Sequence, residues 1–121
     1  MSFEFANDTP IYLQIIEEIK LRIITGEYLP SEKLPSVREM SVLFNVNPNT
    51  VQKALQALEE QELIFTERTN GKFVTESREK IEKIRCEKIN CIIKDFFDSM
   101  AKIGLSQEDA KRAIEGEEID L

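Results

Sequence analysis

The chain has no histidine, and this absence bears on several kinds of site. Histidine is the usual general base of enzymes, the usual switch near neutral pH and a frequent zinc ligand, so each role lacks its ordinary residue. A glycine-rich phosphate loop is missing too, and no pair of carboxylates stands out among the many acids. We therefore predict a protein that is not an enzyme and that uses no metal ion and no cofactor.

Cysteines are scarce, since Cys86 and Cys91 are the only two. They lie five residues apart in a stretch with a helical pattern, so their side chains point about 140° apart, which argues against a disulfide within the chain. We expect buried or half-buried thiols. A disulfide between two copies of the chain is the alternative, which a reducing cytoplasm disfavours.

Long apolar runs and a targeting segment are missing as well. No run approaches the roughly 20 apolar residues that cross a bilayer. Residues 1–10 carry Glu4 and Asp8 and lack the basic start of a secretory signal. These features predict a cytoplasmic protein that does not bind membranes.

A basic surplus, the usual mark of nucleic-acid binding, is also absent, because the net charge is −7. Residues 1–75 hold seven Lys/Arg and eleven Asp/Glu, a net charge of −4. Residues 76–121 hold nine and twelve, a net charge of −3. Any DNA binding must therefore depend on where individual charges lie.

Helical patterns dominate the first part of the chain. Isoleucines recur at three- and four-residue steps over residues 11–24, which predicts an amphipathic helix. Residues 27–35 contain two prolines and are predicted to form a loop. Ser36 and Glu39 then fit a capping box that opens a short second helix. The apolar side of that helix is predicted to consist of Val37, Met40, Val42, Leu43 and Phe44.

After a turn at Asn45 and Val46, a third helix has the clearest pattern in the chain. Asn47 is a favourable N-cap and Pro48 a favourable first-turn residue. One side is predicted to be buried and consists of Val51, Ala54, Leu55 and Leu58. A separate exposed side consists of Asn49, Gln52, Lys53 and Gln56.

The third helix is followed by a predicted hairpin and then by more helix. Two β-prone runs, residues 63–67 and 72–75, flank Arg68-Thr69-Asn70-Gly71, where the Asn-Gly pair tolerates the positive φ angles of a tight turn. A long amphipathic pattern starts at Ser77, and Ser106 opens a final short helix. Helix, helix, turn, helix and hairpin in this order describe a winged helix-turn-helix. We therefore predict a mainly α fold with a small β-hairpin.

In a winged helix-turn-helix the helix after the turn enters the major groove of DNA, and the hairpin loop reaches the neighbouring backbone or minor groove. Asparagine and glutamine can pair with adenine, and lysine can bond guanine or a phosphate. The exposed side of the third helix suits this role, and Arg38, Arg68 and Lys72 would supply cations around the duplex.

Several of these residues also have a purely structural interpretation. Ser36 could serve only as a cap, Gln52 and Lys53 could be ordinary solvated residues, and Asn70-Gly71 could be a plain turn. The acidic balance adds an alternative function, a winged-helix module that binds a protein. Stable association with a protein, without DNA binding, would favour that alternative.

Four segments of the chain resemble the GntR family of bacterial regulators, in particular its small YtrA-like branch. They are Pro10-Ile11-Tyr12, the run from Leu34 to Glu39, Val46-Asn47-Pro48-Asn49-Thr50-Val51-Gln52-Lys53-Ala54, and Gly71-Lys72-Phe73-Val74. The resemblance implies a winged-helix domain that binds double-stranded DNA, at a palindromic operator, as a homodimeric repressor. Residue patterns and resemblance together predict DNA contacts by Ser36, Arg38, Asn49, Thr50, Gln52, Lys53, Arg68, Asn70, Gly71 and Lys72.

The residues after the hairpin are predicted to join two copies. The resemblance implies a short helical dimerisation segment here, because about 45 residues are too few for the metabolite-binding domain of most family members. We therefore predict domains at residues 1–76 and 77–121 and identify no small-molecule effector. The apolar stripe of the long helix must be covered by its own domain or by a second copy, and we predict the second copy. The predicted dimer contacts are Ile81, Ile84, Ile89, Ile92, Ile93, Phe96, Phe97 and Met100.

Overall fold

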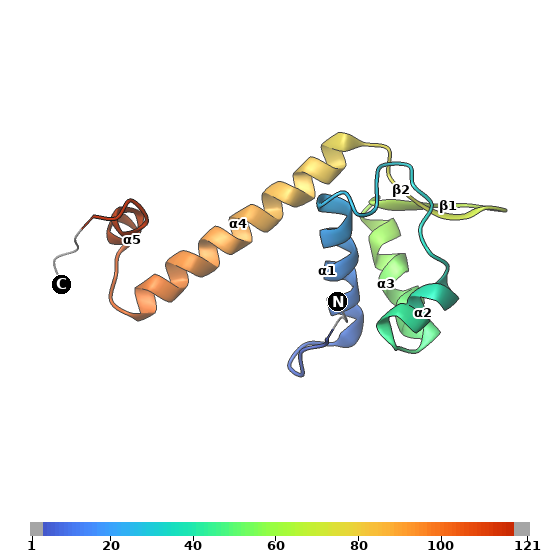
Figure 1. Ribbon diagram of the computed structural model, residues 1–121, viewed down its shortest axis with the longest axis horizontal. Coiled ribbons are helices and arrows are strands. Elements are labelled where there is room, and N and C mark those ends of the chain that lie inside the picture. The colour runs from blue at the N-terminus through green and yellow to red at the C-terminus, as the bar shows by residue number, and fades with distance from the viewer. Residues whose placement is uncertain (1–3, 118–121) are drawn as a thin grey trace. The chain divides into compact units, whose positions relative to one another are not determined.

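Five helices and one hairpin make up residues 4–117, the part of the chain that the computed structural model describes (Figure 1). The elements are α1 (Ile11–Ile24), α2 (Val37–Phe44), α3 (Pro48–Glu60), β1 (Ile64–Glu67), β2 (Gly71–Val74), α4 (Arg78–Lys102) and α5 (Gln107–Ile114). The predicted mainly α fold with a hairpin is confirmed. Among residues 4–117, none of the helices has the length and apolar character of a membrane span.

The chain divides into two compact units between Ile84 and Arg85. The first turns of α4 therefore belong with the three helices and the hairpin, whereas the predicted domain boundary, between residues 76 and 77, lies just ahead of α4. Ile81 and Ile84 explain the difference, because both are buried in the same core as the residues of α1 and α3.

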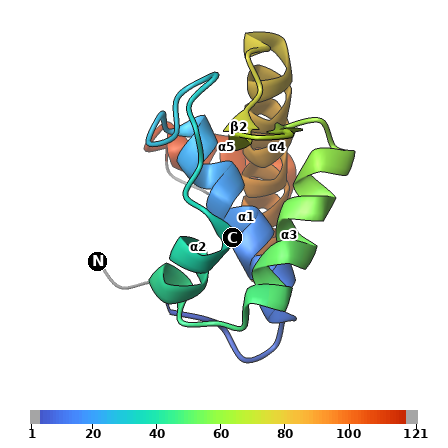
Figure 2. The ribbon, with the colours of Figure 1, turned by 90° about the vertical axis from the view of Figure 1, so that its right-hand side faces the viewer.

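The core of the first unit is built around α3, which packs against α1, α2 and β1. Figure 2 shows the three helices of this unit side by side. The predicted buried side of α3 is confirmed residue by residue, and its four members are Val51, Ala54, Leu55 and Leu58. The opposing side of α1 buries Ile15, Ile16, Ile19 and Ile23. Removing these apolar side chains from water is the main force that holds the two helices together.

Side-chain caps set where α2 and α3 begin, as predicted. The hydroxyl of Ser36 accepts a hydrogen bond from the amide of Glu39, and the carboxylate of Glu39 accepts one from the amide of Ser36, both at 3.1 Å. The side chain of Asn47 accepts from the amide of Asn49 at 2.8 Å, ahead of a proline in the first turn. Each cap satisfies an amide that has no partner within its helix.

The turn between α2 and α3 is closed by Asn45, which adopts a left-handed conformation with φ of 53°. Asparagine tolerates this conformation better than most residues. The hydroxyl of Ser41 donates to the carbonyl of Val46 at 2.6 Å and so ties α2 to the turn. The turn therefore has a defined geometry that fixes the entry of α3.

The hairpin forms as predicted, but its loop differs from the expected tight Asn-Gly turn. Glu67 pairs with Gly71, and the amide of Asn70 donates to the carbonyl of Glu67, so three residues form the loop. Gly71 has φ of 102°, whereas Asn70 has no positive φ. The positive φ therefore belongs to Gly71, the first residue of β2, and not to a residue of the loop itself.

A short bridge joins the hairpin to the α1–α2 connection, which the sequence predicts only as a loop. Lys33 forms an isolated antiparallel bridge with Phe73. The amide of Leu34 donates to the carbonyl of Lys72 at 2.8 Å, and the amide of Val74 donates to the carbonyl of Glu32 at 2.9 Å. The bridge gives β2 a partner on its second edge and anchors the base of the hairpin.

The predicted apolar side of α2 is only partly buried. Met40 and Phe44, four residues apart, are buried, but Val42 and Leu43 are 78% and 50% exposed. The prediction was wrong for these two residues because, within the described residues, α2 packs mainly against α3, on one side of the helix. Val42 follows Met40 by two residues, or about 200° around the helix, so it faces away from α3.

The second unit contains the remainder of α4 together with α5. Beyond Ile84, no residue of α4 is buried. Cys86 and Cys91 are therefore free and exposed, which corrects the expectation of buried or half-buried thiols. As predicted, Ser106 caps α5, since its hydroxyl accepts from the amide of Asp109 at 3.1 Å.

Candidate nucleic-acid interface

The polar side of α3 is the centre of the candidate interface. Asn49, Gln52 and Lys53 are exposed, and Thr50 is half-buried. The buried side of the helix is fully occupied by the core, so the polar side chains lie away from it. No acid stands in the first turn of α3. A helix with this division can present amide and ammonium groups to the edges of bases.

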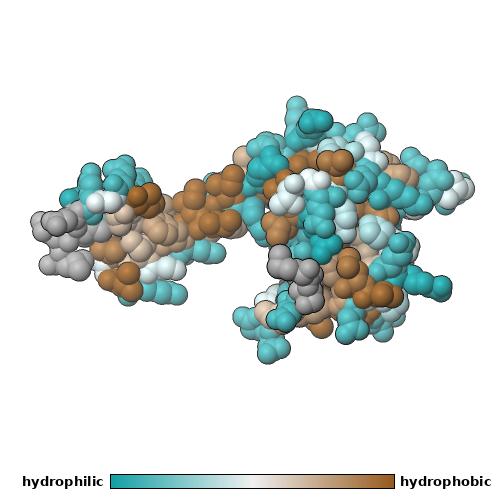
Figure 3. Space-filling model, in the orientation of Figure 1, coloured by the Kyte–Doolittle hydropathy of each residue, from teal (hydrophilic) through white to brown (hydrophobic). Residues whose placement is uncertain are grey.

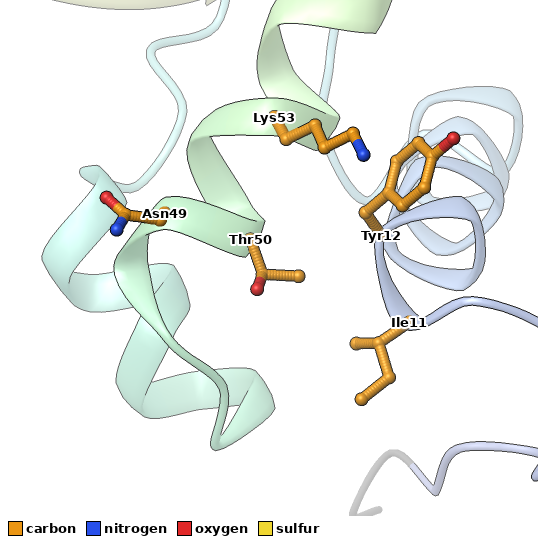
Figure 4. Close-up of a pocket in the computed structure, with 5 residues that line it drawn as sticks. All are labelled: Ile11, Tyr12, Asn49, Thr50 and Lys53. Atoms are coloured by element: carbon orange, nitrogen blue, oxygen red, sulfur yellow. The ribbon is translucent and has the colours of Figure 1, made fainter.

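A notch lies between the beginning of α3 and the beginning of α1 (Figure 4). Its volume is about 380 Å³, and it is lined by Ile11, Tyr12, Asn49, Thr50 and Lys53. The Lys53 ammonium lies 3.8 Å from the centroid of the Tyr12 ring. Figure 4 shows Lys53 extending across the notch toward Tyr12, whereas Asn49 points away from it on the side of α2.

The site prediction missed two residues of this arrangement, Ile11 and Tyr12, of which Tyr12 is the one that contacts Lys53. It lies in the Pro10-Ile11-Tyr12 segment, so the available signal was the family resemblance of that segment. The periodicity of α1 gave no such signal, because it indicates only that an aromatic residue at this position borders the core. Tyr12 does pack against the core, and its contact with Lys53 is a tertiary feature.

The amino-terminal end of α2 contributes Ser36 and Arg38. The oxygen of Ser36 accepts the capping hydrogen bond, and its side chain also hydrogen-bonds to the Glu39 carboxylate, so Ser36 serves α2 mainly as a cap. Arg38 is exposed and forms no ion pair within the described residues. The pKa of Glu39 beside it lies below the ordinary value because of hydrogen bonds from the backbone and side chain of Ser36. Arg38 therefore remains available to an external anion.

The loop of the hairpin exposes Arg68, Asn70 and Gly71. Asn70 donates from its side chain to Glu67 at 3.2 Å, so its amide helps to shape the loop. Arg68 makes no ion pair in the part of the chain that the structure describes. A protruding loop with an available arginine is the form in which wings reach the DNA backbone or minor groove.

Lys72 occupies a different environment from the other predicted contacts. Its ammonium lies 3.0 Å from the Glu59 carboxylate of α3 and 2.9 Å from the hydroxyl of Thr66, and its side chain is half-buried. Thr66 also donates to Glu59. Partial burial favours the neutral form of Glu59, but the hydrogen bonds from Thr66 and Lys72 and the charge of Lys72 outweigh it, so the pKa is lowered. The Lys72 charge is thus directed to Glu59, a residue of the same chain.

Beyond Ile84, the predicted dimerisation residues of α4 are exposed or half-buried. Ile89, Ile92 and Ile93 are 46%, 63% and 46% exposed, and the half-buried residues are Phe96, Phe97 and Met100. The rings of Phe96 and Phe97 meet edge to face. Figure 3 shows the apolar side chains gathered along α4. Ile81 and Ile84, by contrast, are buried in the core of the first unit.

Comparison with known proteins matches residues 11–74 to the model of a family described as "Bacterial regulatory proteins, gntR family". The HTH-type transcriptional repressor YtrA of Bacillus subtilis is 44% identical over 71 residues, which cover 59% of this chain and 55% of that repressor.

Two solved structures extend the likeness. One is a GntR family transcriptional regulator from Listeria monocytogenes, with a TM-score of 0.85, 37% identity and coverage of 94% of this chain and 100% of that one. The other is AraR(DBD) in complex with operator ORR3, with a TM-score of 0.53, 32% identity and coverage of 62% and 95%.

Proposed function

The chain belongs to the gntR family of bacterial regulatory proteins, and on this basis we propose that it represses transcription by binding a palindromic operator as a homodimer. Its family and its relatives are transcriptional regulators and not enzymes. A DNA-binding domain of this kind has been solved on operator DNA in AraR. A regulator that acts on a bacterial chromosome would work in the cytoplasm.

The polar side of α3 is the observation that carries the proposal. The core fixes the opposite side of the helix, so α3 can enter the major groove with Asn49 and Gln52 toward the base edges. Arg38 from α2 and Arg68 from the hairpin loop would hold phosphates around that contact. Thr50 and Lys53 lie on the α1 side of the same helix.

The exposed stripe of α4 supports the homodimer. Ile89, Ile92 and Ile93 leave about half of their surface or more in water in a single chain. Pairing with a second copy would remove that surface from water, which favours association. Closed two-fold pairing also places two recognition helices on symmetric half-sites, as a palindromic operator requires.

Repression is proposed from the relatives, because YtrA of Bacillus subtilis is described as a repressor. A dimer bound to an operator that overlaps a promoter would prevent RNA polymerase from binding that promoter. This mechanism needs no chemistry from the protein beyond binding.

The test is a titration of the full chain against duplex DNA from the region upstream of its own gene. We expect the chain to bind a palindromic segment of this region at least about a thousandfold more tightly than a shuffled duplex of equal composition. A duplex with a single half-site should bind much more weakly than the palindrome. Equal affinity for palindrome and shuffled duplex, or no binding at low salt, would contradict the proposal.

A further inference from the structure

The Lys53 ammonium is held by a tyrosine rather than by a carboxylate. It lies 3.8 Å from the centroid of the Tyr12 ring, well within the distance at which a cation is attracted to an aromatic face. Among the described residues, Lys53 forms no ion pair. The positive charge is therefore positioned but not neutralised, in contrast to that of Lys72, which lies 3.0 Å from Glu59.

The ring also determines the direction in which Lys53 points. Tyr12 comes from α1, and its ring packs against the core, so it has a fixed place. Figure 4 shows that Lys53 reaches across the notch toward it, with Thr50 on the same side of α3 and Asn49 directed the other way. Lys53 is thus turned from the middle of the polar side of α3 toward the α1 side.

This placement fits a phosphate better than a base. One side of the ammonium lies toward the ring, and the exposed Lys53 side chain leaves the rest of it open to the notch, which Thr50 also lines. A compact ammonium acts as a point charge that suits phosphate oxygens. The edges of bases are contacted by residues near the beginning of the recognition helix, here Asn49 and Gln52.

We infer that Tyr12 is a positioning residue that holds the Lys53 ammonium at the α1 side of α3, where the notch receives a backbone phosphate of operator DNA. The inference rests on the proposed function, since it assumes that α3 enters the major groove. It assigns Lys53 to affinity and leaves base preference to other residues of α3.

The test is a double-mutant cycle in the full chain with Tyr12→Leu and Lys53→Met, measured on the operator duplex and on a shuffled duplex. A cation–π contact at an exposed site corresponds to about a two- to fivefold change in affinity, so Tyr12→Leu should weaken operator binding by that factor. In the Lys53→Met background the same change should have no further effect. Lys53→Met should weaken both duplexes and reduce the slope of log affinity against log salt by about 0.9, the loss of one phosphate contact.

The conservative variant Tyr12→Phe separates positioning from direct contact. It keeps the ring and should bind as the wild type does. The inference is overturned if Tyr12→Phe binds as weakly as Tyr12→Leu. It is also overturned if Tyr12→Leu weakens operator binding by the same factor in the Lys53→Met background as in the wild type. A change of preference at one base pair in Lys53→Met would also overturn it, because it would place Lys53 on a base.

A second measurement does not depend on the folding of any Leu variant. In the wild-type chain the ε-methylene protons of Lys53 should show the upfield NMR shift of protons above an aromatic ring. If these protons show no upfield shift, the pairing of Lys53 with the Tyr12 ring is overturned. Failure of the wild type to bind any palindromic duplex would instead contradict the proposed function, so the two failures are distinguishable.

Discussion

Replacing Ile92 by glutamate should dissociate the proposed dimer. Ile92 is 63% exposed in the single chain. Burying a whole isoleucine side chain contributes about 1.5–3 kcal/mol, so covering the exposed part contributes about 1–2 kcal/mol in each copy. A two-fold dimer contains the position twice, which gives about 2–4 kcal/mol, or about a 30- to 700-fold change in the dimer dissociation constant. A carboxylate without a partner adds a desolvation cost to this loss.

Lys94→Gln is the matched control for Ile92→Glu. Both substitutions make the net charge more negative by one, but Lys94 follows Ile92 by two residues and lies about 200° around the helix, on the side opposite the stripe. Lys94 pairs with Asp98 at 2.7 Å, and both side chains are largely exposed. An exposed pair of this kind contributes little, so the control variant should associate as the wild type does.

Sedimentation equilibrium over a dilution series distinguishes a species of 14.0 kDa from one of twice that mass. We expect similar dimer dissociation constants for the wild type and Lys94→Gln. Ile92→Glu should have a far higher dissociation constant and should therefore be monomeric at concentrations at which the wild type is still a dimer. Circular dichroism checks that each variant is folded. If Ile92→Glu associates as strongly as the control, the stripe of α4 is not the interface and the dimer must be sought elsewhere.

Three further predictions concern the DNA-binding unit. Gln52→Ala should reduce the free-energy difference between the preferred base pair and the others at one operator position by about 1–3 kcal/mol. Gln56→Ala, one turn farther along α3, should leave that difference unchanged. Competition with singly substituted operators measures the effect of both variants. Ser36→Ala should lower the free energy of unfolding in urea by about 0.5–2 kcal/mol, because α2 loses its cap. The lowered pKa of Glu59, beside Lys72, contributes stability above pH 4.5 that is lost as the pH falls through the lowered value. Glu59→Gln should therefore lose less stability on acidification than the wild type does.

Local signals predicted the helices and their caps well. The start of α3 depends on Asn47 and Pro48, and the start of α2 on Ser36 and Glu39, which interact with amides no more than three residues away. The apolar spacing of α3 then determined its buried side. Such features need no knowledge of the rest of the fold, because both partners lie within one turn of helix.

Features that depend on packing partners could not be predicted in this way. The exposure of Val42 follows from the packing of α2 against α3 on the other side of the helix, and the pairing of Lys33 with Phe73 joins segments forty residues apart. Lys72 appears in the sequence as a free cation beside the hairpin, but the register of the hairpin places it against Glu59. Tyr12 was missed for the same reason, because its partner Lys53 lies on another helix.

The placement of charge reconciles a net charge of −7 with DNA binding. Two acids at and just beyond the far end of α3 have partners in the chain, since Glu59 pairs with Lys72 and Glu62 with Lys80 at 2.9 Å. The beginning of the helix carries Lys53 and no acid. At physiological salt the Debye length is about 8 Å, so distant exposed acids are largely screened, whereas direct contacts with phosphates are screened much less. The other acidic residues of the chain should therefore weaken non-specific binding to DNA more than they weaken the specific operator complex. This difference raises the specificity of binding.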